Sequence, residues 1–449
     1  MKWFKRIAVG LGLLIALLAV LPFFISLNDY IPRIEQEVSA RLKEPVKIRS
    51  LRAAILPAPH VTVDGIAVGK TEDLKVGKVT VTPALFSLFD SPRIIKSIEI
   101  DGLVLTQKAI DKIPLWTKSD TKPGAPPQPP PVIVESIRLD DALVKLDKTS
   151  FGPFDARIRL DARNEPQEAA ITTRDGKLRI SLTPGKSNYL IDASAKSWKL
   201  PAGPAIVFDE LTVKGVATLS DASFEQVAAR LYGGTVNGNA GVSWRKGLQL
   251  RGNFTVSGVE LKPLVPLLAP GKNMSGKLDA KPVFSSSAGN AAQLADAMRL
   301  DTPFSVRNGV LYGVDIQKAA TSLVKQGSSG GETRFEELSG HLAMDRRTYH
   351  FTQIRIASGS LAANGNVGIS PRKELSGRIN AQVSVAGASA NVPLNVSGTL
   401  DSPMLFPTGG TVAGAAVGTA ILGPGVGTSL GAKVGNWTEN LFGKKEEKK

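Results

Sequence analysis

The sequence predicts a mainly β protein in which an N-terminal transmembrane helix is followed by an elongated, curled antiparallel β-sheet that forms an open groove. A few short helices and a Gly-rich helical C-terminus complete the expected fold. Three observations predict it: an uncharged apolar run near the start, alternating apolar and polar residues over most of the remainder, and Asn-Gly or Asp-Gly pairs among the alternating runs. Only 6% of the 449 residues are aromatic, whereas the 44 Gly and 29 Pro suit many strands and turns.

Residues 7–27 form the apolar run, and at about 1.5 Å per residue they can cross a hydrocarbon core of about 30 Å. Three basic residues lie in the segment 1–6, so the positive-inside rule places this N-terminus in the cytoplasm and the body on the far side of the membrane. A cleaved signal peptide is the alternative, but residues 21–25 offer no A-x-A-like site. The candidate anchor residues are Ile7, Leu14, Leu18 and Phe24.

Composition limits the classes of partner and of chemistry. The chain has no Cys, which removes thiol chemistry and Cys-ligated metals and leaves hydrogen-bonded sheet and apolar burial to stabilise an exported body. The formal net charge of +15 would suggest nucleic acid in a nuclear protein, but on an exported body it favours anionic lipid headgroups. A charge spread over solvated strand faces explains it equally well, and we expect no nucleic-acid partner.

Residues 28–43 are predicted to form an amphipathic helix, with Asn28 or Asp29 as its N-cap and Pro32 in its first turn. Its apolar residues form one narrow stripe: Ile31, Ile34, Val38 and Leu42. Such a helix suits either the membrane interface or a plug on the end of a sheet. The narrow stripe and the mixed charges favour the plug.

From Val46 onward the apolar period is two, which indicates antiparallel strands with one apolar and one polar face. The alternating sets are Val61/Val63, Val79/Val81, Ile98/Ile100, Ile158/Leu160, Leu178/Ile180/Leu182, Leu248/Leu250, Phe254/Val256, Ile354/Ile356, Val367/Ile369 and Val383/Val385. Six Asx-Gly pairs are expected to make tight hairpins: Asp64-Gly65, Asp101-Gly102, Asp175-Gly176, Asn237-Gly238, Asn308-Gly309 and Asn364-Gly365.

The Pro-rich segment 121–131 cannot join a ladder and is predicted to link an N-terminal β unit, 44–120, to a central β-groove, 132–325. A C-terminal β unit is expected over 333–405. Short helical or turn-like segments are expected at 83–89, 261–268, 291–299 and 316–324. Glycines four residues apart predict a helical hairpin over 409–443, either active at a membrane or packed as a cap on the sheet end, before a solvated charged tail at 444–449.

Nothing in the sequence predicts catalysis, a cofactor or a metal. His60, His341 and His350 lack metal-ligand spacing. The acidic pair Asp140-Asp141 is interpreted as a bulge on a solvated strand face, because neighbours on a strand point to opposite faces. The glycines of 423–435 fit neither the dinucleotide fingerprint nor the P-loop. The chain is therefore not expected to be an enzyme.

A one-sided sheet without an active site has two readings. Two facing sheets would make a sandwich with a filled core, and the protein would be a scaffold. One long sheet curled into a trough would leave its apolar face free for acyl chains, each buried CH₂ gaining about 0.8 kcal/mol; some 25 strands at about 4.8 Å would span on the order of 120 Å. Periodicity does not separate these readings. The candidate lipid-contacting residues are Leu248, Leu250, Phe254, Val256, Ile354 and Ile356.

Several stretches resemble the AsmA family of Gram-negative envelope proteins, itself similar to TamB-like proteins. They are Tyr30 to Glu35, Pro45 to Ile48, Val61 to Ile66, Arg230 to Gly238 (with Tyr-Gly-Gly), Arg307 to Ile316, Thr333 to Gly340, Asn364 to Ile369 and Val392 to Pro403. The resemblance covers both ends well and the middle loosely. It implies a cell inner-membrane anchor, a periplasmic groove of the repeating β type found in chorein-like bridge proteins, a part in outer-membrane biogenesis and phospholipid as substrate class. It supplies no residue-level site.

The leading hypothesis is a groove that carries phospholipid acyl chains between the inner and outer membranes, with an outer-membrane or periplasmic protein as a further partner. The runner-up is a non-catalytic periplasmic scaffold or assembly factor for outer-membrane proteins.

Overall fold

The computed structural model describes residues 27–407, except 57, 85, 88–90, 117–129, 147–148, 202, 219, 246, 290–292, 322–328, 360 and 386–387. The predicted cytoplasmic segment 1–6, nearly all of the predicted transmembrane helix 7–27, most of the linker 121–131, the hairpin 409–443 and the tail 444–449 lie outside these residues. Within the part of the chain that the structure describes, no helix has both the length and the apolar character needed to cross a bilayer.

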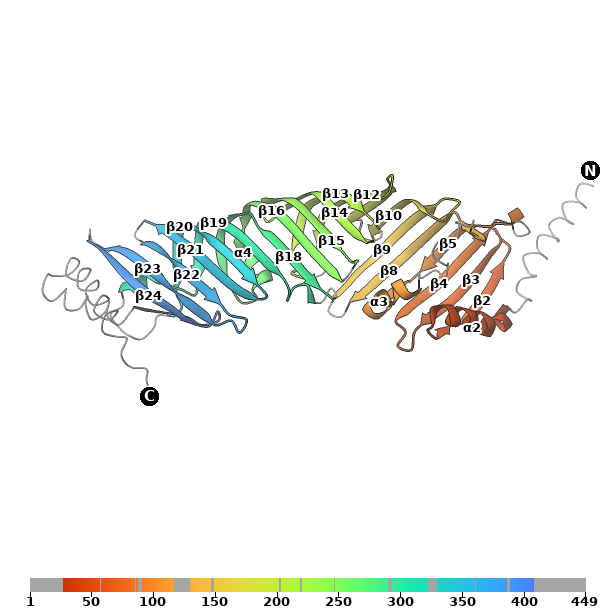
Figure 1. The fold of residues 1–449 in the computed structure, drawn as a ribbon, viewed down its shortest axis with the longest axis horizontal. Helices are drawn as coiled ribbons and strands as arrows, with labels where there is room; N and C mark the ends of the chain where they lie inside the picture. Colours follow the sequence, from red (N-terminus) through yellow and green to blue (C-terminus); the bar gives the residue numbers. More distant parts are fainter. Residues whose placement is uncertain are drawn as a thin grey trace, which may run out of the picture. The chain divides into compact units, whose positions relative to one another are not determined.

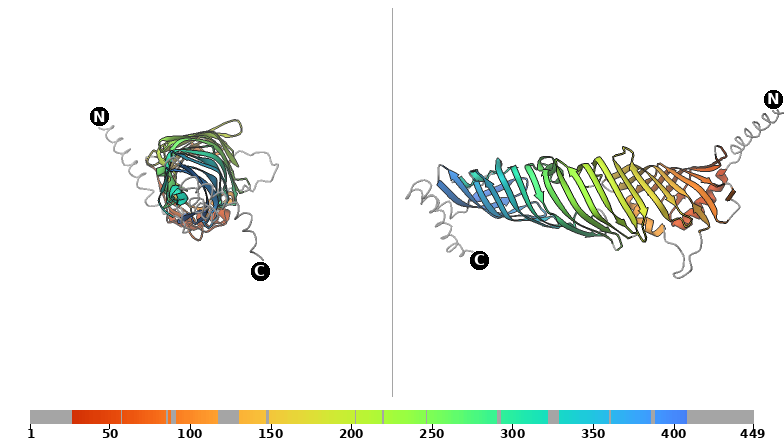
Figure 2. Two further views of the ribbon diagram at one scale, coloured as in Figure 1. Left: turned by 90° about the vertical axis from the view of Figure 1, so that its left-hand side faces the viewer. Right: turned by 90° about the horizontal axis from the view of Figure 1, so that it is seen from above.

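The chain divides into two compact units, 1–203 and 204–449, and each consists mainly of one curled sheet with few helices (Figures 1 and 2). The mainly β, curled architecture predicted from the sequence is therefore confirmed. The first unit contains strands from both sides of the predicted Pro-rich linker.

The N-terminal unit is a ladder in which most neighbours are antiparallel. Its strands are β1 (Val46–Lys47), β2 (Ser50–Ala54), β3 (His60–Val68), β4 (Leu74–Pro83), β5 (Arg93–Asp101), β6 (Val104–Thr106), β7 (Val132–Val134), β8 (Ser136–Leu146), β9 (Thr149–Leu160), β10 (Pro166–Thr173), β11 (Leu178–Pro184) and β12 (Tyr189–Lys199). β5 pairs in parallel with β7 and β8, and β6 pairs in parallel with β8. The expectation of antiparallel neighbours throughout was wrong here, because the chain from α3 (Gln107–Trp116) to β7 supplies the long crossover that parallel strands need.

The first edge of this sheet is capped by side chains that precede it. The 3₁₀ turn η2 (Leu27–Tyr30) leads into α2 (Ile31–Leu42). Neither Asn28 nor Asp29 caps α2: its N-cap is Tyr30, which makes no side-chain cap bond. Asn28 Oδ1 instead accepts from the N–H of Leu51 at 3.0 Å.

Two residues of α2 continue this capping. Glu35 Oε1 accepts from the N–H of Ile48 at 2.7 Å, and Ser39 Oγ accepts from the N–H of Val46 at 3.0 Å. An exposed sheet edge otherwise templates pairing with another chain. The bonds support the interpretation of this helix as a plug on the sheet end.

An ion-pair network fastens α3 to the same unit. Lys112 Nζ lies 2.6 Å from Glu44 Oε1 and 2.9 Å from Asp73 Oδ2. The Asp73 side chain is only 5% exposed and also accepts from Thr71 Oγ1 at 2.5 Å. The Thr71 hydroxyl and then the Lys112 ammonium hold the pKa of Asp73 below its ordinary value. Glu44, followed by Asp73, raises the pKa of Lys112.

These shifts predict a pH window for the docking of α3. The lowered pKa of Asp73 stabilises the fold above pH 3.8, and this stabilisation is lost as the pH falls through the folded-state pKa. The raised pKa of Lys112 stabilises the fold below pH 10.5, and this stabilisation is lost as the pH rises through the folded-state pKa. We expect amide exchange in α3, measured relative to an unstructured chain at the same pH, to be slow between these limits and to accelerate at either extreme. Lys112→Met should accelerate it at neutral pH as well. The matched change Lys108→Met on the same helix should have a much smaller effect, because Lys108 makes only the smallest contribution to the lowered pKa of Asp73. Equal exchange in both variants would contradict the role of this network.

The C-terminal unit is antiparallel throughout its strand pairs. Its strands are β13 (Val207–Ala217), β14 (Asp221–Leu231), β15 (Gly234–Ser243), β16 (Leu248–Glu260), β17 (Met274–Ala280), β18 (Val283–Ala288), β19 (Arg299–Tyr312), β20 (Glu332–Asp345), β21 (Thr348–Ser358), β22 (Leu361–Ile369), β23 (Leu375–Val385), β24 (Ala388–Gly398) and β25 (Pro403–Pro407). The predicted helical segments 261–268 and 316–324 correspond to α4 (Leu261–Leu268) and α5 (Ile316–Thr321).

The apolar core of this unit lies where α4 and α5 pack on the sheet. Leu261 and Leu264 of α4 and Ile316 and Ala319 of α5 are buried in one cluster with residues of β16 and β19–β25. Ile316 and Leu394 are 1% and 0% exposed. This part of the sheet is therefore covered on its apolar face.

Five of the six predicted Asx-Gly hairpins were wrong. Asp175-Gly176 does turn between β10 and β11, whereas Asp101-Gly102 separates β5 from β6, which both pair with β4. The other four pairs lie inside β3, β15, β19 and β22. In β15, β19 and β22 a Cβ on the glycine would overlap a backbone carbonyl oxygen of the neighbouring strand. These glycines therefore permit close strand approach within the sheet rather than a turn.

Candidate functional site

The apolar face of the N-terminal unit carries two continuous rows of side chains across the strands. The pairing registers align them as Ala53–Val61–Val81–Ile98–Ile137–Ile158–Ala169–Leu182–Ile191 and Leu51–Val63–Val79–Ile100–Leu139–Ala156–Ile171–Ile180–Ala193. Each row crosses nine strands, from β2 to β12. The parallel step from β5 to β8 keeps the rows in register, since Ile98 pairs with Ile137 and Ile100 with Leu139.

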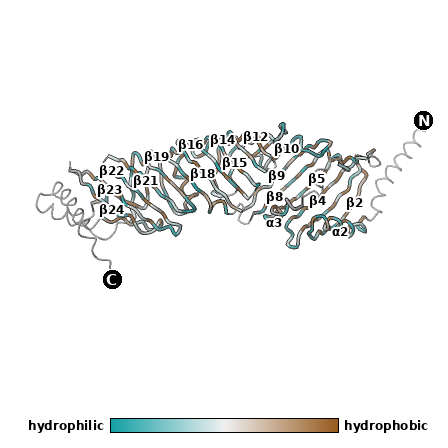
Figure 3. The backbone as a smooth tube through the Cα atoms, in the orientation of Figure 1, coloured by the Kyte–Doolittle hydropathy of each residue, from teal (hydrophilic) through white to brown (hydrophobic). Residues whose placement is uncertain are grey.

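The rows are only partly covered. Leu51 is the one large aliphatic side chain in them that is buried, and every Val and Ile is half-buried. The opposite face carries exposed polar residues such as Glu99, Arg157 and Ser181. Figure 3 shows the resulting alternation of hydrophilic and hydrophobic residues along the strands. A facing sheet in a sandwich would bury such rows, so the structure favours an open face in this unit.

The candidate residues on β16 share one face. Leu248, Leu250, Phe254 and Val256 are half-buried, while the intervening Gln249, Arg251, Asn253 and Thr255 are exposed. Val256 also packs against the core cluster under α4 and α5. The alternation predicted for this strand is confirmed.

Ile354 and Ile356 occupy a different environment on β21. They are 9% and 5% exposed and belong to the core cluster that contains α4 and α5. The structure therefore places them on the apolar side of the sheet but beneath other side chains, apart from the half-buried set on β16. Contact with lipid remains a prediction for all six residues.

Cross-strand Phe–Gly pairs line the apolar side of the C-terminal unit, and the sequence reading missed them. Phe254 pairs with Gly238, Phe284 with Gly252, Phe304 with Gly340 and Phe335 with Gly309. A Cβ on Gly252 would meet both the Phe284 ring at 2.7 Å and the Phe254 ring at 3.0 Å, and these two rings stack with centroids 5.8 Å apart. Rings laid over glycines fill the space on the inside of a curled sheet, where full-size side chains on adjacent strands would collide.

The acidic pair is an irregularity in the sheet, as predicted. Asp141 has φ +57°, and the pairing of β8 with β9 shifts between Leu139 and Ala142. Asp140 lies 2.9 Å from Arg138, and Asp141 lies 2.9 Å from Arg174. Each carboxylate is thus paired with its own guanidinium. In the described ranges, no three His, Cys, Asp or Glu side chains gather closely enough to hold a metal ion.

Residues 210–348 match the family model described as the AsmA family. This stretch runs from β13 to the first residue of β21 and includes the Tyr232-Gly233-Gly234 turn and the whole of the Arg307 to Gly340 region. It contains three of the stretches quoted above, Arg230 to Gly238, Arg307 to Ile316 and Thr333 to Gly340. The N-terminal stretches and the last two, from Asn364 onward, lie outside it. No curated protein and no solved structure matches the chain.

Proposed function

Because the chain belongs to the AsmA family, we propose that it is an inner-membrane-anchored, periplasmic β-groove protein that carries phospholipid acyl chains between the inner and outer membranes. Residues 7–27 supply the anchor in this proposal, and the N-terminus is cytoplasmic. The protein acts without catalysis: it moves lipid along a surface and changes no covalent bond.

The observation that carries the proposal is the pair of half-buried aliphatic rows on the N-terminal unit. Eight inter-strand steps of about 4.8 Å make a path on the order of 40 Å. One leaflet of a hydrocarbon core about 30 Å thick is shorter than that path. An acyl chain can therefore move from a bilayer onto these rows and exchange one apolar environment for another. Burial from water gains about 0.8 kcal/mol per CH₂ in both environments.

Mass spectrometry of lipids bound to the purified full chain tests this function. We expect phospholipid to co-purify, and Ile180→Asp to reduce the bound amount by about tenfold, because the carboxylate must be desolvated beneath an acyl chain. Ser181→Asp is the matched control, since Ser181 is the next residue of β11 and lies on the exposed polar face. It should leave the bound lipid unchanged.

Circular dichroism and thermal melting of both variants separate loss of lipid from loss of fold. Wild-type protein that carries no lipid, or an Ile180→Asp variant that is folded and fully loaded, would refute the groove.

The covered core of the C-terminal unit favours a second candidate, a non-catalytic scaffold for outer-membrane proteins. Its buried cluster spans α4, α5 and eight strands, an arrangement typical of a structural domain. Under this alternative the purified chain is lipid-free and retains a protein partner in pull-downs. Deletion would then leave lipid distribution between the two membranes unchanged.

A further inference from the structure

A hollow of about 890 Å³ lies across β14, β15, β16, β18 and β19 of the C-terminal unit. Four arginines line it: Arg245, Arg251, Arg299 and Arg346. Among the described residues of the lining, Asp221 is the only carboxylate. The lining therefore carries a clear excess of positive charge.

Small side chains on the polar face of the sheet make room for the hollow. Pairing aligns Ser223, Gly241, Arg251, Ser285 and Arg299 in one row across the five strands. Ser243 and Ser287 belong to the adjacent row on the same face. Ser223, Ser285 and Ser287 are exposed. A strip of Gly and Ser between long arginines leaves a depression with hydroxyl groups at its floor.

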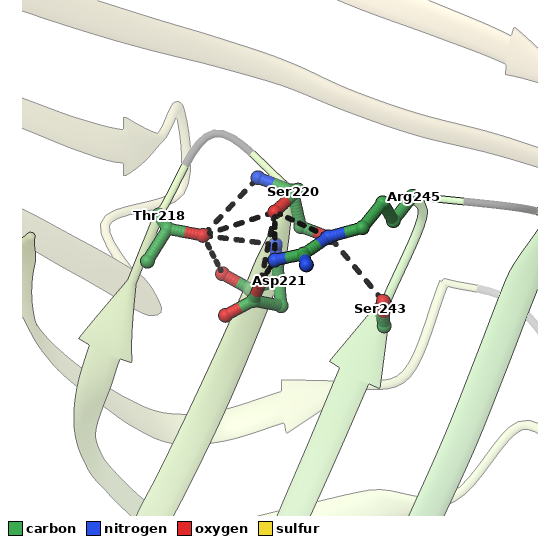
Figure 4. Close-up of polar contacts among 5 residues, drawn as sticks. All are labelled: Thr218, Ser220, Asp221, Ser243 and Arg245. Atoms are coloured by element: carbon green, nitrogen blue, oxygen red, sulfur yellow. Dashed lines mark hydrogen bonds and ion pairs between the residues drawn. The ribbon is translucent and has the colours of Figure 1, made fainter.

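Two of the guanidinium groups are held in place by neighbouring side chains. Arg245 donates to Ser220 Oγ and pairs with Asp221 (Figure 4), and its guanidinium lies 3.0 Å from Asp221 Oδ2. Arg299 Nε lies 3.2 Å from Asp345 Oδ1. Each guanidinium has five N–H donors and uses only some of them in this contact. The remaining donors are available to a ligand. The loop and the strand ends thus present preoriented donors.

Arg251 is different, because no ion-pair partner for it occurs among the described residues. Its side chain crosses over Gly241, whose Cβ position would lie 3.3 Å from Arg251 Nε. Arg251 follows Leu250 on β16, so the two side chains point to opposite faces of the strand. Leu250 nevertheless belongs to the lining of the hollow, so the hollow borders the candidate lipid-contacting face at this residue.

We propose that this hollow binds a phosphate-bearing group. Arginine forks match the oxygens of a phosphate in bidentate geometry, and serine hydroxyls add neutral donors. The volume falls within the range of about 300–1,000 Å³ typical of small-molecule sites. It is large enough for the group attached to the phosphate as well as for the phosphate itself. The source is either a soluble phosphate ester or the headgroup of a membrane lipid.

Binding measurements on the full chain test the site with two probes. Glycerol 3-phosphate represents the soluble source, and its binding is measured by calorimetry. Vesicles of phosphatidylglycerol represent the headgroup, and vesicles of a phosphate-free glycolipid serve as the comparison. Binding is measured by co-flotation of the full chain, which is held in nanodiscs of the same phosphate-free glycolipid. In the double variant Arg251→Gln/Arg299→Gln we expect binding of the responsive probe to fall by at least about tenfold, since each charged hydrogen bond removed weakens it.

The matched control is Arg307→Gln, which lies on the same strand and the same face as Arg299 but outside the hollow, paired with Asp279 at 2.7 Å. It should bind as wild type does. A response of glycerol 3-phosphate assigns a soluble ligand, and a response of the vesicles alone assigns a lipid headgroup. Binding of neither probe, or equal loss in Arg307→Gln, would overturn the proposal.

The site and the transport groove fail independently. The double variant should retain co-purified phospholipid, because its changes lie on the polar face. Conversely, Ile180→Asp should retain binding at the hollow, since Ile180 belongs to the other unit.

Discussion

Replacing Leu394 with Ala is expected to destabilise the C-terminal unit by about 3–5 kcal/mol, which is the range for a fully buried leucine whose surroundings cannot collapse. Leu394 is 0% exposed. It pairs with Ile379 on β23 and with Pro407 on β25, and it belongs to the cluster that includes α5. Hydrogen-bonded strands on both sides limit how far the cavity can close, so the full cost should be felt.

The measurement is hydrogen exchange of the amides in β23–β25, because a chain of two units need not unfold in one step. Exchange there should accelerate in Leu394→Ala, while β2–β11 of the other unit should be unaffected. Asn395→Ala is the matched control: Asn395 is the next residue on β24 and is exposed. Acceleration of the same size in both variants would show that the cluster does not stabilise these strands.

Period-two alternation could predict the faces of the strands because register and burial follow from it directly. Val61, Ile98, Ile158 and Ile180 all lie on the apolar side where their spacing placed them. The same reading could not predict which neighbours are parallel. The pairing of Ile98 with Ile137 depends on where the crossover after α3 returns the chain, and no local pattern records that.

The turns were the weakest prediction, for a physical reason. An Asx-Gly pair signals a glycine with unusual backbone freedom, and a hairpin is only one use of it. At Asn308, with φ +52°, the pair sits inside β19, and its glycine pairs with Phe335. The Phe–Gly pattern becomes visible only when strands are aligned, since Phe254 and Gly238 are 16 positions apart in the chain. Sequence spacing alone carries no sign of it.

Burial of the candidate site was likewise only half predictable. Alternation makes Leu250 and Ile356 equivalent, yet Leu250 is half-buried and Ile356 is 5% exposed. The difference comes from α4 and α5, which cover one part of the apolar face and leave another part uncovered. The sequence predicts that a helix of six to eight residues forms, but it does not predict the strands on which that helix packs. That placement decides which residues remain accessible to a lipid.

Gly365→Ala tests whether the glycines inside strands are structural. A Cβ at Gly365 would overlap the carbonyl oxygen of Arg378 and lie 2.8 Å from Ile379 Cα, both on the adjacent strand β23. Gly365 also pairs with Ile354 on its other side, so the backbone cannot shift away without disturbing a second strand. We expect a loss of about 3 kcal/mol, at the upper end of the cost of overpacking, and faster amide exchange in β22 and β23.

Gly359→Ala provides the comparison, because Gly359 lies just before β22 and a Cβ there would meet nothing within 4 Å. Its backbone has no positive φ, so alanine should be tolerated and the melting temperature should stay within about 2 °C of wild type. If Gly365→Ala behaved as Gly359→Ala does, the strands could separate freely at this point. The close approach of β22 and β23 at Gly365 would then contribute nothing to the stability of the sheet, and the glycine would be replaceable there.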